Sequence, residues 1–69
     1  MIEVTCVVDD EESVKAFVKV DDISSVAEAT KRTKAHCERI NAVIEMKNNG
    51  GELQVEETYL RIKELIEEL

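Results

Sequence analysis

The chain has 69 residues, of which nine are basic and sixteen acidic, and its formal net charge is −7. This balance argues against general affinity for DNA, RNA or an anionic membrane, because neutralised phosphate supplies most of that attraction. A chain of this size buries only roughly 60% of its extended surface, which leaves little room for a large enclosed active site. We expect one small domain that covers residues 1–69 and needs no cofactor.

The sequence has no run of about 20 apolar residues, the length that a membrane-spanning helix needs. Met1 leads directly into an alternating segment, whereas a signal peptide starts with basic and then apolar residues. We therefore expect a cytoplasmic protein without membrane insertion. Thiols are reduced by default in that compartment, so Cys6 and Cys37 are expected to be free.

Two alternating segments near the N-terminus predict a pair of strands. Residues 2–8 and 14–20 both alternate between the two faces of a strand and are rich in β-branched side chains. The acidic residues 9–13 between them are poor strand formers, so a turn is expected there. A calcium site is the alternative for this acidic run, but a calcium loop is longer and contains a Gly at its bend. A solvated turn is favoured.

Phe17 is the only phenylalanine, and alternation places it with Lys15 and Lys19 on the less buried face of the second strand. Two interpretations are open. Phe17 is a core residue that becomes covered because the sheet curls, or it is an exposed aromatic residue that contacts a partner. We favour the first, because Phe side chains are more often buried than exposed.

Residues 21–41 are compatible with two structures. A helix capped by Asp22 would contain good helix formers and would extend to about Lys47, but it would leave only two strands, which is a marginal foundation for a domain. Its apolar positions, at near-heptad spacing, are Val26, Ala29, Thr33, Cys37, Ile40 and Ile44. In the extended alternative, a third strand follows a bend at residues 21–22, residues 31–39 form an exposed hairpin tip, and Ile40 starts the return strand. The sequence leaves residues 24–41 open between helix and strand plus loop.

Residues 42–69 give the strongest local signals. Two alternating runs, Ala42/Ile44/Met46 and Leu53/Val55, flank an Asn-Asn-Gly-Gly turn, which supplies the positive φ that a tight hairpin needs. Thr58 then fits the N-cap of a helix from about residue 58 to residue 68. The apolar residues on one face of this helix are Ile62, Leu65, Ile66 and Leu69.

The segments MIEVTCV, FVKVDDISSV, VIEMKNNGGELQVEET and YLRIKELI resemble the small bacterial FlbD/SwrD-like family of flagellar and swarming-motility proteins. The family pattern is a short strand, a V-x-x-D-x-I-x-x-V bend, an I-x-L-x-N-G-x-x-x-V-x-E-S hairpin and a short C-terminal helix. Residues 30–39 depart from it, as an insertion between the third and fourth strands, and so does the turn at residues 9–13. The resemblance implies no catalytic residue. The matching positions, which it marks as fold determinants, are Asp22, Ile23, Gly50, Val55, Glu57 and Thr58.

His36, Cys37 and Cys6 form the only group that suggests chemistry. A Cys-His pair needs the imidazole within hydrogen-bond reach of the thiol, and zinc sites commonly use paired C-x-x-C or H-x-x-x-H spacings, which are missing here. The sequence also contains no Gly-rich phosphate loop and no Ser nucleophile elbow. We therefore predict no catalytic residue, no metal ligand and no enzyme activity.

The basic segment 31–39 reverses the local charge of an acidic protein. It could meet an acidic partner surface, although a solvated tip that aids solubility is the simpler interpretation. The candidate partner-binding residues are Lys31, Arg32, Lys34, Arg39 and Phe17. The exposed glutamates of the last helix, Glu64, Glu67 and Glu68, suggest instead a phosphate mimic that occupies a nucleic-acid site of another protein.

We predict an α+β fold: a small curled antiparallel sheet of about five strands, barrel-like, capped by one C-terminal amphipathic helix. The alternative is a ββαα fold with a long central helix. The predicted core consists of Ile2, Val4, Cys6, Val18, Val20, Ile23, Val26, Ile44, Met46, Leu53, Val55, Ile62, Leu65 and Ile66. We predict that the protein is a non-enzymatic accessory factor that binds another protein and is related to motility. A homo-oligomer is also compatible with the sequence. The alternative is a small acidic inhibitor or nucleic-acid mimic encoded by a phage or mobile element.

Overall fold

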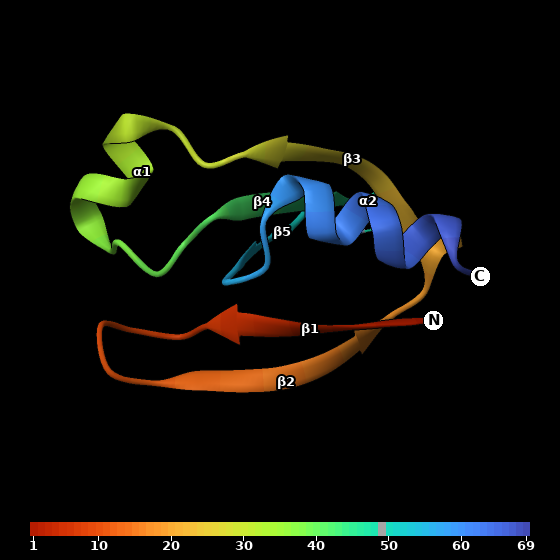
Figure 1. Cartoon of the computed structure of the whole chain (residues 1–69), viewed down its shortest axis with the longest axis horizontal. Coiled ribbons are helices and arrows are strands. Elements are labelled where there is room, and N and C mark those ends of the chain that lie inside the picture. The colour runs from red at the N-terminus through yellow and green to blue at the C-terminus, as the bar shows by residue number, and fades with distance from the viewer. Residues whose placement is uncertain (49) are drawn as a thin grey trace.

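The computed structural model describes residues 1–48 and 50–69, and it contains five strands and two α-helices. The strands are β1 (Ile2–Val7), β2 (Ser13–Val18), β3 (Ile23–Glu28), β4 (Ala42–Met46) and β5 (Glu52–Val55). The helices are α1 (Lys31–His36) and α2 (Tyr59–Glu67), and a 3-10 turn, η1 (Val20–Asp22), joins β2 to β3. All paired strands are antiparallel, in the order β2-β1-β5-β4-β3. The predicted α+β fold with a C-terminal helix is confirmed at this level (Figure 1).

The first hairpin forms as the alternation predicts, with Ile2 opposite Val18 and Val7 opposite Ser13. The acidic turn between its strands has its own hydrogen bonds. One carboxylate oxygen of Asp9 accepts the backbone N–H groups of Glu11 and Glu12, both at 2.8 Å. An Asp side chain that bonds the backbone two residues ahead replaces a backbone turn, so this acidic segment closes the hairpin.

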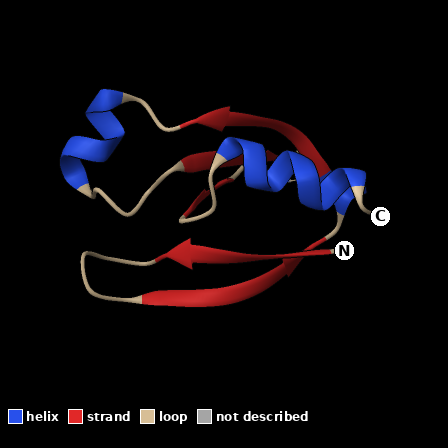
Figure 2. Ribbon diagram, in the orientation of Figure 1, coloured by secondary structure: helices blue, strands red, loops and turns tan. Residues whose placement is uncertain are grey.

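The alternative fold with a long central helix is wrong, because residues 23–28 form β3 and pair with β4. Val26 and Ile44, which the helical interpretation puts on one helix face, lie opposite each other on neighbouring strands. The hairpin-tip interpretation is also incomplete, since the β3–β4 connection contains the six-residue helix α1 (Figure 2). Thr30 caps α1 by accepting the Thr33 N–H at 3.1 Å, and the chain becomes extended at Cys37.

The second hairpin joins β4 to β5, with Ala42 opposite Val55 and Ile44 opposite Leu53. Its turn is the predicted Asn-Asn-Gly-Gly segment, of which Asn49 lies outside the described residues. Gly50 has a φ of 62°, and an added Cβ would meet no atom within 4 Å. Glycine is therefore favoured at this position by backbone conformation and not by lack of space.

The core lies between the sheet and α2. Its buried side chains are Ile2, Val4, Val18, Ala42, Ile44, Val55 and Ile62. All 14 predicted core residues are buried in this cluster or pack against it, whereas buried Ile40 and Ala42 were not predicted. Thr58 caps α2 by accepting the Arg61 N–H at 3.1 Å, as the sequence predicted.

In Figure 1, α2 lies in front of β4 and β5, between β3 and β1. Its residue Ile62 is fully buried against the sheet, while Leu60 on the opposite side is 66% exposed. The helix therefore covers the sheet with Ile62, Leu65 and Ile66 of the predicted face. The fourth predicted residue, Leu69, lies beyond the end of α2 and is 70% exposed, so its place on this face was wrongly predicted. Among the residues that the structure describes, no helix is long and apolar enough to cross a membrane.

Candidate functional site

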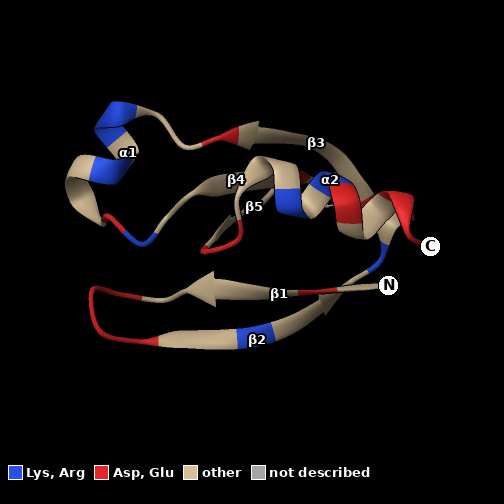
Figure 3. Cartoon of the chain, in the orientation of Figure 1, with Lys and Arg blue, Asp and Glu red and all other residues tan. Residues whose placement is uncertain are grey.

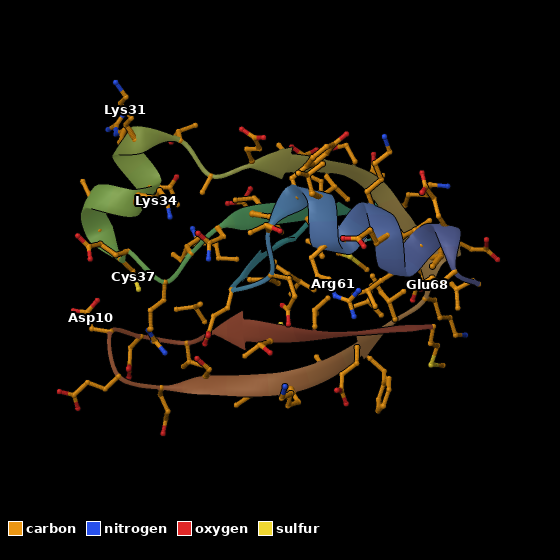
Figure 4. All side chains as sticks on the ribbon, in the orientation of Figure 1. Asp10, Lys31, Lys34, Cys37, Arg61 and Glu68 are labelled. Carbon is orange, nitrogen blue, oxygen red and sulfur yellow. The ribbon has the colours of Figure 1, made fainter. Side chains whose placement is uncertain are left out.

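The four cations predicted to bind a partner fall into two groups. Lys31 and Arg32 open α1, are exposed, and make no side-chain hydrogen bond or ion pair within the described part of the chain (Figure 3). In Figure 4, Lys31 points away from the body of the molecule. These two cations remain available to an outside partner.

Lys34 instead folds back onto its own chain. Its ammonium donates to the Asn41 side-chain oxygen at 2.8 Å and to the backbone oxygens of Glu38 and Ile40 at 3.2 and 3.3 Å. These acceptors belong to the connection between α1 and β4, which starts with a turn at residues 38–39. Lys34 therefore fixes the path from α1 to β4, and its charge is partly satisfied inside the molecule.

Arg39 joins three segments that are far apart in the sequence. Its guanidinium donates to the Ser13 hydroxyl at 2.7 Å, to the Glu12 backbone oxygen at 3.2 Å and to the Asp9 backbone oxygen, and it lies 3.5 Å from the Glu56 carboxylate. Ser13 also donates to Glu56. We call these five residues the Arg39 network. It ties the β1–β2 turn to the end of β5, which is a structural task.

The Arg39 side chain is 33% exposed, and the buried Nε atom has no hydrogen-bond partner among the described residues. The fixed fork of a guanidinium suits several acceptors at once, which a Lys at this position could not match. Because 26 to 30 residues separate Arg39 from its partners in the first turn, no local pattern indicates this role. The basic surface that remains available to a partner therefore consists of Lys31 and Arg32, and not of all four predicted cations.

A second long-range contact closes the seam between β1 and β5, where a single residue pair, Cys6 and Val55, is in register. The Glu57 carboxylate accepts the Thr5 backbone N–H at 2.7 Å and the Thr5 hydroxyl at 3.0 Å, and the Glu56 N–H bonds the Thr5 oxygen at 2.9 Å. Burial and, secondly, the Glu57 charge raise the pKa of the neighbouring Cys6 thiol. The Glu57 carboxylate therefore takes the place of backbone pairing where the ladder between β1 and β5 ends.

The positions shared with the FlbD/SwrD-like pattern have structural tasks. Asp22 accepts the Lys47 N–H with its backbone oxygen at 2.8 Å and the Asn48 amide with its side chain at 3.1 Å. Gly50 provides the positive φ, Val55 is fully buried, and Thr58 caps α2. Together with Glu57 at the seam, these contacts agree with fold-determining roles.

Phe17 is not the core residue that we favoured from the sequence. Its side chain is 69% exposed on the outer face of β2, opposite Glu3 of β1. The rest of the described chain leaves most of the Phe17 side chain uncovered. Val14, on the other face of the same strand, is 51% exposed, so β2 presents apolar surface on both sides. This strand and the start of α1 are the candidate interaction surfaces.

The residues that suggested chemistry in the sequence are His36, Cys37 and Cys6. His36 is exposed, and Cys6 and Cys37 are both free, as expected. Within residues 1–48 and 50–69, no three His, Cys, Asp or Glu side chains are placed to hold a metal ion. A groove of about 240 Å³ between β3 and α2 is lined by Val26, Tyr59, Lys63, Ile66 and Glu67. The wall of this groove is mainly apolar, and its two charged residues are Lys63 and Glu67.

The sixteen acidic residues are spread over much of the chain, and two groups of them lie far apart. The β1–β2 turn and the end of α2 lie at opposite ends of the long axis (Figure 3), as the labelled Asp10 and Glu68 also show (Figure 4). The helix glutamates Glu64, Glu67 and Glu68 are exposed, as predicted.

Comparison of the chain with family models, with curated proteins and with solved structures gives no match.

Proposed function

We propose that this protein is a non-enzymatic accessory factor that binds another protein through β2. The observation that supports this most directly is the 69% exposure of Phe17 on the outermost strand of the sheet. Exposed aromatic side chains are typical anchors of protein interfaces. An outermost strand also offers unpaired backbone groups, to which an extended segment of a partner can add.

The basic start of α1 has a secondary part in this proposal. Lys31 and Arg32 project from the molecule, whereas Lys34 and Arg39 are engaged in contacts within the chain. Two exposed cations attract an acidic partner and orient it, and they do so less as salt rises, since the Debye length falls from about 10 Å at 0.1 M to about 3 Å at 1 M. We assign orientation to α1 and affinity to β2.

We also infer that the sheet curls toward a barrel. The outer strands β2 and β3 would lie about 19 Å apart in a flat sheet of this order, at about 4.8 Å per strand. The chain from Val18 to Ile23 reaches at most about 18 Å when fully extended, and its middle is the compact turn η1. The two outer strands must therefore approach each other at this end. A curled sheet still leaves β2 as an edge.

For the biological setting we propose a role near flagellar or swarming motility, in the cytoplasm. The support is the resemblance of the strand, hairpin and helix segments to FlbD/SwrD-like proteins. Gene neighbourhood tests this part, since flagellar genes beside the coding sequence support it and phage genes contradict it.

The alternative is a small acidic inhibitor or nucleic-acid mimic from a mobile element. It is favoured by the net charge of −7 and by the exposed glutamates at the end of α2. Exposed glutamates and a net negative charge are also typical of the surface of any acidic domain, so they do not point to a nucleic-acid mimic in particular. We therefore rank it second.

Capture of partners from the native host tests the binding proposal. We expect the Phe17→Ser variant to lose the captured protein, and a Lys31→Glu/Arg32→Glu variant to capture less of it at low salt and the same amount at high salt. Leu60→Ser is the matched control, because Leu60 is similarly exposed, at 66%, but lies on α2. Capture that is equal for wild type and Phe17→Ser contradicts binding through β2.

A further inference from the structure

Backbone hydrogen bonds of β1 show which backbone groups of β2 point outward. The Val8 N–H bonds the Glu12 oxygen at 2.9 Å, so the ladder between β1 and β2 uses the even-numbered residues. As a check, odd-numbered Thr5 directs both its N–H and its oxygen toward the β5 side. It follows that Lys15 and Phe17 of β2 direct their N–H and C=O groups away from β1.

The two edges of the sheet differ in how well they could accept another strand. The β3 edge has an irregular register between Ile23 and Ser25, and its Val26 faces a groove shared with α2. Strand β2 pairs with β1 in unbroken register over six residues and forms the lower border of the molecule in Figure 1. Natural proteins usually protect such a regular edge with charges, bulges or Pro, and in β2 only Lys15 is charged.

We propose that the strand added to this edge is β2 of a second copy of the chain, paired antiparallel about a two-fold axis at Ala16. This proposal rests on the proposed use of β2 as the binding surface. In this register Lys15 of each copy lies opposite Phe17 of the other, and each such pair exchanges both N–H···O bonds. Val14 of each copy lies opposite Val18 of the other, which covers the exposed Val14.

Charge argues against the two neighbouring registers. A two-fold axis at Lys15 would set the two Lys15 side chains against each other, and an axis at Phe17 would set Lys15 against Lys19 of the other copy. Like charges directly opposite each other destabilise a sheet. With the axis at Ala16, each ammonium lies over an aromatic ring, which is a favourable cation–π contact. Glu3, on the far side of that ring in β1, adds the opposite charge to the same row.

Sedimentation equilibrium between about 5 µM and about 1 mM tests the dimer, since an interface of one strand per copy is small and therefore weak. We expect concentration-dependent dimers for wild type. Phe17→Ser and Lys15→Glu should each raise the dimer dissociation constant by about tenfold or more, since every dimer loses two contacts. Leu60→Ser should leave it unchanged. A wild-type chain that stays monomeric over this range overturns the proposal, and so does a dimer that tolerates Phe17→Ser.

Cysteine cross-linking tests the register, in a background with Cys6→Ala and Cys37→Ser. The two Ala16 residues would form a non-hydrogen-bonded pair with Cα atoms about 4.5 Å apart, within the range of a disulfide. We expect Ala16→Cys to give covalent dimers under mild oxidation and Lys15→Cys to give few. Equal cross-linking of both variants, or more from Lys15→Cys, contradicts the axis at Ala16.

The two proposals can fail separately. If the wild type is monomeric but Phe17→Ser loses the host partner, the dimer is overturned and partner binding through β2 stands. If Phe17→Ser abolishes the dimer but captures the host partner like wild type, the dimer stands and partner binding through β2 is overturned.

Discussion

The Arg39 network predicts that Arg39 stabilises the fold although it is partly exposed. We consider the variant Arg39→Ala, which removes the donors to Asp9, Glu12 and Ser13 and the cation beside Glu56. Among the described residues, Arg39 makes the only side-chain contacts between the β1–β2 turn and the β3–β4 connection, and this variant removes them. The interpretation of residues 31–39 as a solvated tip predicts no such tie.

The loss in free energy of unfolding expected for Arg39→Ala follows from the number of these contacts and from their exposure to water. A hydrogen bond in a protein contributes about 0.5–1.5 kcal/mol net, and an exposed ion pair about 0–1 kcal/mol. Water can replace Arg39 at the exposed turn oxygens, so the sum is reduced to about 1–3 kcal/mol. A domain of this size has a free energy of unfolding of about 3–10 kcal/mol. The expected fall in the thermal midpoint is about 4–8 °C for each kcal/mol.

Urea denaturation measures this loss, provided that the free energy of unfolding falls with urea concentration at the same slope in all variants. Arg32→Ala is the control, because Arg32 is exposed and a surface substitution changes stability by under about 0.5 kcal/mol. Arg39→Lys should recover less than half of the loss, since an ammonium cannot supply the fork. Hydrogen exchange should quicken in the turn at residues 9–12. Equal stability of Arg39→Ala and wild type would refute the stabilising role of the network.

Three further predictions concern the core, the cap and the thiol. Ile62→Ala should lower the free energy of unfolding by about 2–5 kcal/mol, because Ile62 is fully buried. Ile66→Ala should lower it less, because Ile66 is only partly buried. Chemical denaturation that ranks the two variants in the opposite order contradicts the described packing. Thr58→Ala should cost about 0.5–2 kcal/mol through loss of the α2 cap, and Thr58→Ser should restore most of it in the same assay. The raised pKa of Cys6 means that the folded state holds the thiol proton more tightly, so its contribution is complete below the ordinary value of 9.0 and is lost as pH rises above it. Stability should fall less between pH 8 and a pH of about 10.5 in Cys6→Ala than in wild type, and an identical fall in both would show that Cys6 has no part in it.

The sequence by itself determined the elements that depend on neighbouring residues. Alternation and β-branching produce the β1–β2 hairpin, the Gly-containing turn places β4 beside β5, and Thr58 starts α2 three residues before its bonded N–H donor, Arg61. Alternation also assigned Phe17 to the less buried face of β2. Each of these features is encoded within about ten residues, so local patterns are sufficient to predict it.

Tertiary structure decided which of two local preferences prevails in the middle of the chain. Residues 23–28 have helix formers after them and a near-heptad pattern around them, but pairing of Val26 with Ile44 places them in the sheet. Helix formation survives only at residues 31–36, where Thr30 supplies a cap and no strand is alongside. Pairing prevails because it buries side chains against a core that a solitary helix lacks.

The candidate surfaces were also decided by tertiary contacts. The sequence identifies a cluster of four cations, but it does not show that Arg39 reaches across to the first turn or that Lys34 turns back toward Asn41. It likewise leaves Phe17 open between core and surface, because the answer depends on whether another part of the sheet covers β2. Charge and alternation are properties of the chain, whereas exposure and engagement depend on which distant segments meet.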